Sequence, residues 1–104
     1  DPSDDYLVYG TITDVEKVPI EGVVVRAVDQ DFTGENPLGE ETRTNSKGQY
    51  KIPYRSSDFI IDGKETGGAD IILYVYDPSG ELLHRAKPRR NAPKRKEINV
   101  TIQR

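Results

Sequence analysis

The sequence contains no cysteine, no methionine, no tryptophan and only one histidine, His84. The absence of cysteine excludes disulfide bonds, thiol catalysis and zinc sites built from cysteine. A single histidine excludes a metal site that needs several histidines. Because methionine is absent, residue 1 is not a translation start, and we expect the chain to be excised from a longer protein. No apolar run approaches the roughly 18 residues of a membrane-spanning helix, so we expect no membrane insertion.

The balance of charges indicates a folded domain. Charged residues make up 32% of the 104 residues, yet the formal net charge is only −3, so the two signs are mixed rather than mutually repelling. The length suits one small domain with a thin core. We expect residues 1–5 to form a disordered lead-in or linker and residues 6–104 to form a single β-sandwich domain.

Short apolar runs with turn residues between them are typical of an all-β sandwich or barrel. They predict seven antiparallel strands and at most one short helical turn, near residues 57–61. The strands are expected at residues 6–13, 22–29, 40–44, 49–54, 69–77 and 81–86 and from about residue 97 onward. Residues 30–39 and 87–96 are expected to be loops. The predicted core comprises Val8, Ile12, Val23, Val25, Ala27, Tyr50, Ile52, Ile71, Leu73, Val75, Leu82, Ile98, Val100 and Ile102.

Three segments carry a family resemblance: YGTITD at 9–14, VPIEGVVVRA at 18–27 and TNSKGQYKI at 44–52. Together they resemble the carboxypeptidase regulatory-like (transthyretin-like, prealbumin-type) family, whose pattern is G-x-V-x-D, P-L-x-G-V-x-V and T-x-x-x-G-x-Y. The resemblance implies a Greek-key β-sandwich with an accessory, modular role, and it supplies no activity. The sequence departs from the family pattern after Tyr54, where SSDF replaces the usual G-x-Y-x-L.

A narrower resemblance concerns a subgroup embedded in very large bacterial proteins, some of them similar to Tc-type toxin subunits. It is carried by RAVD at 26–29, Asp31, Leu38-Gly39-Glu40, Tyr50 and Asp58-Phe59. This resemblance implies an exported or cell-surface bacterial parent protein.

The acidic segment after the second predicted strand has the residue spacing of a calcium-binding loop. Asp29, Asp31 and Glu40 stand at positions 1, 3 and 12 of an EF-hand pattern, with Thr33 at position 5. No helix is predicted before this segment, and Pro37 stiffens it. We therefore expect a solvated acidic loop without a cofactor, and we keep calcium at Asp29, Asp31, Thr33 and Glu40 as an alternative.

Positive charge gathers near the end of the chain. Residues 84–104 hold eight Lys or Arg and one acid, whereas residues 1–83 hold seven Lys or Arg and 17 acids. Arg89, Arg90, Lys94 and Arg95 fall around the loop before the last predicted strand. We expect them to contact an acidic surface on a neighbouring domain or another protein. The segment has no aromatic residue to stack on bases, so we expect no binding of nucleic acid.

Tyr74 and Tyr76 share one side of a predicted strand, because side chains alternate along a strand. Two exposed rings on one face could dock a protein partner or stack on a sugar. A Ser-His-Asp triad would need His84, Ser56 or Ser57, and Asp58, and no G-x-S-x-G segment accompanies them, so we expect no catalysis. The sequence thus predicts a non-catalytic interaction module, with a ligand-binding module for carbohydrate or calcium as the alternative.

Overall fold

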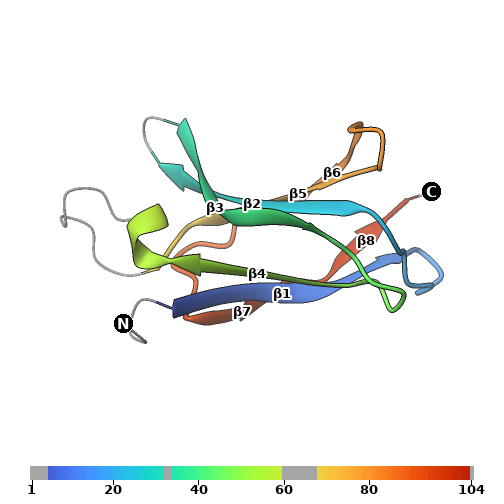
Figure 1. Cartoon of the computed structure of the whole chain (residues 1–104), viewed down its shortest axis with the longest axis horizontal. Helices are drawn as coiled ribbons and strands as arrows, with labels where there is room; N and C mark the ends of the chain where they lie inside the picture. The colour runs from blue at the N-terminus through green and yellow to red at the C-terminus, as the bar shows by residue number, and fades with distance from the viewer. Residues whose placement is uncertain (1–4, 32–33, 60–67, 104) are drawn as a thin grey trace.

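The computed structural model describes residues 5–31, 34–59 and 68–103, which form two β-sheets packed as a sandwich (Figure 1). This confirms the predicted all-β sandwich. The strands are β1 (Asp5–Asp14), β2 (Val24–Asp31), β3 (Gly34–Arg43), β4 (Gln49–Arg55), β5 (Ile71–Tyr76), β6 (Leu82–Arg85), β7 (Arg95–Glu97) and β8 (Val100–Ile102). Among these residues, no helix is long and apolar enough to cross a membrane.

The predicted helical turn and the predicted lead-in each lie partly within the described residues. One 3-10 turn, η2 (Ser56–Asp58), lies close to the predicted helical turn, whose last two residues, 60 and 61, fall outside the described residues. Residues 1–4 of the expected lead-in also fall outside them, and Asp5 already belongs to β1.

The first sheet combines antiparallel and parallel pairing. β4 runs antiparallel to β1, whereas β7 and β8 both run parallel to it. The prediction of a wholly antiparallel sandwich is therefore wrong. The reason is the connection after β6, which carries the chain from the second sheet to the first, where the last strands enter in the direction of β1.

Arg95 and Lys96 were predicted to be loop but form β7 with Glu97, and the predicted last strand continues after a break as β8. The described residues therefore form eight strands rather than seven. At the break, the Ile98 N–H still donates to the Tyr9 carbonyl oxygen, over 2.8 Å. The Thr11 N–H donates instead to the side-chain oxygen of Asn99, over 2.9 Å. The Ile98 carbonyl oxygen accepts the Tyr50 hydroxyl, over 2.6 Å. Side-chain bonds therefore replace part of the backbone ladder while β7 and β8 stay beside β1.

The second sheet has the order β3-β2-β5-β6 and is antiparallel throughout. β3 includes residues 34–39, which were predicted to be loop. The reason is a tight hairpin, because the Asp31 carboxylate accepts the Gly34 N–H over 2.9 Å and the Asn36 side-chain amide over 2.7 Å. The hairpin also brings Leu38 into the core, where it is buried.

The core lies between the two sheets and follows the predicted alternation. Every predicted core residue is buried except Leu82, which is 48% exposed because β6 is an edge strand. An aromatic cluster of Tyr6, Tyr54 and Phe59 adds to the core, with ring centroids 5.2 to 6.0 Å apart. Burial raises the pKa of Tyr54 to about 12.

The packing around Gly10 gives a first prediction. A Cβ atom at this position would overlap the backbone carbonyl oxygen of Ile98, which the Tyr50 hydroxyl holds in place. We expect Gly10→Ala to lower the free energy of unfolding by about 2–3 kcal/mol, because overpacking against backbone cannot be relieved by a rotamer change. Urea unfolding followed by circular dichroism measures the loss.

Thr101→Ala is the matched control, since Thr101 lies exposed on the neighbouring strand β8. We expect it to change the free energy of unfolding by less than about 1 kcal/mol. Equal losses for the two variants would contradict the close approach at Gly10.

Candidate functional site

The outer face of the second sheet carries the two tyrosines singled out above. Ile71, Leu73 and Val75 of β5 point into the core, so Tyr74 and Tyr76 point outward and are half-buried. Their cross-strand partners complete the surface, which we call the tyrosine face. It comprises Tyr74 and Tyr76 of β5, Val24 and Arg26 of β2, and Leu82 and Arg85 of β6.

Polar contacts hold Tyr74 in place. Its hydroxyl lies 2.8 and 2.9 Å from the two carboxylate oxygens of Glu35 and 3.3 Å from the Arg85 Nε, which donates to it. The Arg85 guanidinium also lies 5.8 Å from the ring centroid, a cation–π arrangement. The ring of Tyr76 is 6.3 Å away and tilted by 25°. The two rings thus form a pre-ordered pair on the sheet.

A hollow of about 400 Å³ lies beside Tyr76 on this face. Val24 and Arg26 of β2, and Glu41 and Arg43 of β3, line it together with the turn at residues 77–80. The volume lies within the range of ligand pockets, roughly 300–1,000 Å³. The site therefore combines the apolar side chains of Val24 and Pro78 and the ring of Tyr76 with charged side chains of both signs.

A turn built on Asp77 forms one wall of the hollow. The same Asp77 carboxylate oxygen accepts the Ser79 hydroxyl over 2.6 Å and the backbone N–H groups of Ser79 and Glu81, each over 2.9 Å. The hydrogen bond from the Ser79 side chain, followed by those from the backbone, lowers the pKa of Asp77. The carboxylate is thus committed to shaping the turn.

The basic residues predicted to contact a partner are spread over both sheets. Arg89 forms a backbone bridge to Ile71 of β5, whereas Arg95 belongs to β7 and pairs with Leu7 of β1. Arg90 makes an ion pair of 3.3 Å with Asp70, and the Lys94 ammonium lies 5.8 Å from the ring centroid of Tyr6. Arg95 therefore does not lie in the predicted loop. Among the described residues, no hydrogen bond, ion pair or cation–π contact joins the side chains of these four to the tyrosine face.

The proposed calcium ligands are distributed over a hairpin. Asp29 is buried in β2 and its carboxylate accepts the Asp70 N–H over 2.8 Å, whereas Glu40 is exposed in β3. Asp31 ends β2 and caps the hairpin, and Thr33 lies outside the described residues. Over residues 5–31, 34–59 and 68–103, no group of three or more His, Cys, Asp or Glu could hold a metal ion.

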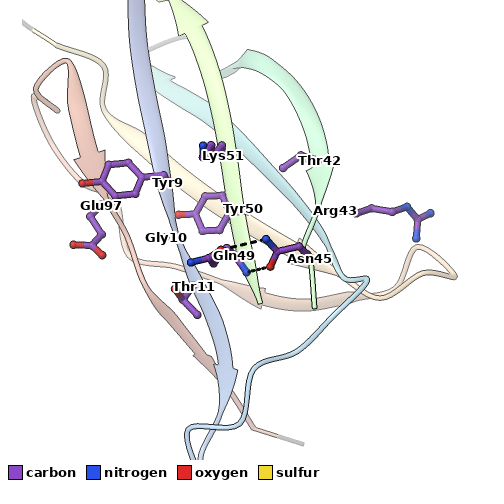
Figure 2. Close-up of a pocket in the computed structure, with 10 residues that line it drawn as sticks. All are labelled: Tyr9, Gly10, Thr11, Thr42, Arg43, Asn45, Gln49, Tyr50, Lys51 and Glu97. Atoms are coloured by element: carbon purple, nitrogen blue, oxygen red, sulfur yellow. Dashed lines mark hydrogen bonds between the residues drawn. The ribbon is translucent and has the colours of Figure 1, made fainter. Parts of the chain in front are cut away.

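A second cavity, of about 550 Å³, lies over β1 and β4 (Figure 2). Its lining is largely polar and includes the charged residues Arg43, Lys51 and Glu97. Figure 2 shows the hydrogen bond between the Asn45 and Gln49 side chains, 3.2 Å long, at its edge. None of the residues predicted to form a site lines this cavity, and the hydroxyl of its buried residue Tyr50 already donates to Ile98.

Comparison with known proteins supports the fold alone. No family model matches the chain, and no curated protein sequence matches it. A 9R-lipoxygenase from Cyanothece PCC8801 is similar in structure, with a TM-score of 0.73 and 17% identity over 97% of this chain and 17% of the lipoxygenase. A 3-chlorocatechol 1,2-dioxygenase from Rhodococcus opacus 1CP is similar with a TM-score of 0.55 and 14% identity, over 96% of this chain and 59% of the enzyme.

Sequence reasoning missed the arginines that surround the tyrosines. Arg26 stands at an outward position between Val24 and Val28, and this isolated charge in an apolar strand was the available signal. Arg43 and Arg85 gave no comparable signal, because their places depend on the register of β3 and β6.

The turn beside the hollow gives a prediction of pH dependence. Because the folded state lowers the pKa of Asp77, its carboxylate stabilises the fold above the unfolded pKa of about 3.9, and this contribution is lost as the pH falls through the folded pKa. We expect Asp77→Asn to lower the melting temperature at pH 7. At pH 2–3 the difference in melting temperature between the variant and the wild type should be smaller. Thermal unfolding at both pH values tests this, and an unchanged difference would contradict it.

Proposed function

We propose that this chain is a non-catalytic interaction module of a larger, exported or cell-surface bacterial protein, and that it docks its partner through the tyrosine face. The observation that carries the proposal is the outward pair Tyr74 and Tyr76, flanked by Val24 and by the exposed Leu82. The resemblance to transthyretin-like domains, with their Greek-key topology and accessory role, supports it. The toxin-like subgroup supports a bacterial parent.

The physical properties of the face suit protein binding. Tyrosine and arginine are the side chains most enriched among residues that dominate binding energy, since each joins a large contact area to a polar group. Glu35 and Arg85 already hold the ring of Tyr74, so binding would immobilise fewer side chains. The arginines and lysine near the last strand would then steer an acidic partner more than strengthen the complex.

Carbohydrate binding is the second candidate function. The hollow beside Tyr76 favours it, because an aromatic ring next to charged hydrogen-bonding groups can hold the apolar face and the hydroxyls of a sugar. This function would require the same tyrosine face, so the two candidates differ in ligand and not in location.

Photo-crosslinking tests the docking face. We expect benzoyl-phenylalanine in place of Tyr76 to crosslink the chain to one defined protein in the cells that produce it. Tyr9 is the matched control position, since it is a half-buried tyrosine on the outer face of the other sheet. We further expect Tyr76→Ser to weaken binding of that purified protein by at least about tenfold, as loss of a central aromatic anchor does, and Tyr9→Ser to leave it unchanged.

Two results would overturn the proposal. One is equal crosslinking from positions 9 and 76, which would indicate random encounter. The other is unchanged affinity of the purified partner for the Tyr76→Ser variant.

A further inference from the structure

The hollow on the tyrosine face contains two arginines without an acidic partner. In the described part of the chain, the exposed side chain of Arg26 makes no hydrogen bond and no ion pair. The hydrogen bond of Arg43 is a long one, 3.4 Å, from its guanidinium to the Gly22 carbonyl oxygen. Both guanidinium groups are therefore available to a ligand.

The nearby acidic groups are mostly committed elsewhere. One carboxylate oxygen of Asp77 accepts three hydrogen bonds within its turn, and both carboxylate oxygens of Glu35 lie within hydrogen-bond distance of the Tyr74 hydroxyl. The Ser79 hydroxyl donates to Asp77. The other carboxylate oxygen of Asp77 and the exposed carboxylate of Glu41 remain as acceptors in the lining. Because guanidinium groups only donate, with five N–H groups each, the two arginines bring more donors to the hollow than these oxygens accept.

The strand register brings the two arginines within reach of one ligand. Arg43 pairs with Val24 across β2 and β3, and Arg26 lies two residues farther along β2, on the same face as Val24. The β2–β3 register is irregular between Val25 and Ala27, at Arg26, and both arginine side chains nevertheless line the same hollow. Val24 lies between Arg43 and Tyr76 across the three strands, since it pairs with both.

We propose that this hollow binds an acidic side chain of an extended partner peptide. The carboxylate accepts hydrogen bonds from Arg26 and Arg43, and an apolar side chain two residues away in the peptide lies against Val24 and Tyr76. A carboxylate accepts hydrogen bonds only, so it matches the excess of donors, whereas sugar hydroxyls also need acceptors. This inference rests on the proposed function and specifies the chemistry of the partner.

A titration of the whole chain, labelled with ¹⁵N, tests the proposal by NMR. The probe is the blocked peptide acetyl-Gly-Glu-Gly-Phe-Gly-Glu-Gly-amide, in which the acids and the ring share one side. We expect saturable shifts of the amide signals of residues 24–26, 43, 76, 77, 79 and 80. The same peptide with Gln in place of Glu should bind at least about fivefold more weakly, since charge-assisted hydrogen bonds are lost.

Variants locate the site. The double variant Arg26→Gln with Arg43→Gln should weaken binding of the acidic peptide at least about fivefold. The matched control combines Lys51→Gln with Arg55→Gln, two exposed basic residues of β4 in the first sheet, and should leave binding unchanged. Unchanged melting temperatures show that the variants remain folded.

Three outcomes would overturn the inference: equal binding of the Glu and Gln peptides, equal loss in the control variant, or shifts at the hollow with cellohexaose but not with the peptide. The last would assign the site to carbohydrate. If Tyr76→Ser weakens binding of the crosslinked partner while neither peptide binds, the docking face is supported and only the proposal of an acidic ligand is wrong.

Discussion

The first sheet depends on one buried hydrogen bond, from the Tyr50 hydroxyl to the Ile98 carbonyl oxygen. Burial raises the pKa of Tyr50 well above its usual value, so the phenol stays protonated and continues to donate. Gly10 leaves room for the Ile98 carbonyl group, and the Asn99 side chain takes over the Thr11 N–H. These contacts allow the end of the chain to run beside β1 although its backbone ladder is interrupted.

This closure determines which surface is left for binding. With β7 and β8 added to the first sheet, β6 remains the edge of the second sheet, and the outer face of β2 and β5 remains outward (Figure 1). Tyr74 and Tyr76 stand there on rigid strands rather than on a loop. A rigid surface with aromatic and arginine side chains is suited to recognition, and its chemistry favours a ligand that supplies acceptors.

The sequence predicted the core well because alternation has a direct physical cause. Val23, Val25 and Ala27 had to face inward, since the opposite side of the same strand carries Arg26. The parallel entry of the last strands could not be predicted, because it depends on where the connection after β6 carries the chain. The length of β3 was not predicted, because Gly34 and the acidic residues around it are typical of a loop. The hydrogen bond from the Gly34 N–H to the Asp31 carboxylate, which holds the hairpin, cannot be read from the sequence.

The candidate site was predicted in part for the same reasons. The alternation of side chains placed Tyr74 and Tyr76 on one side of β5. Arg43 lies near them only because β2 pairs with both β3 and β5. Linear clustering of positive charge was a weaker guide, since Arg89 and Arg95 lie against different sheets. Residues close in sequence share a surface only when the chain between them stays within one sheet.

Native-state hydrogen exchange tests most directly whether the end of the chain is an integral part of the first sheet. The Ile98 N–H donates to Tyr9 and should exchange only through global unfolding, with the same free energy of opening as the amides that pair β1 with β4. Exchange of the Ile98 amide through a much smaller opening, while the β1 and β4 amides remain protected, would contradict this account.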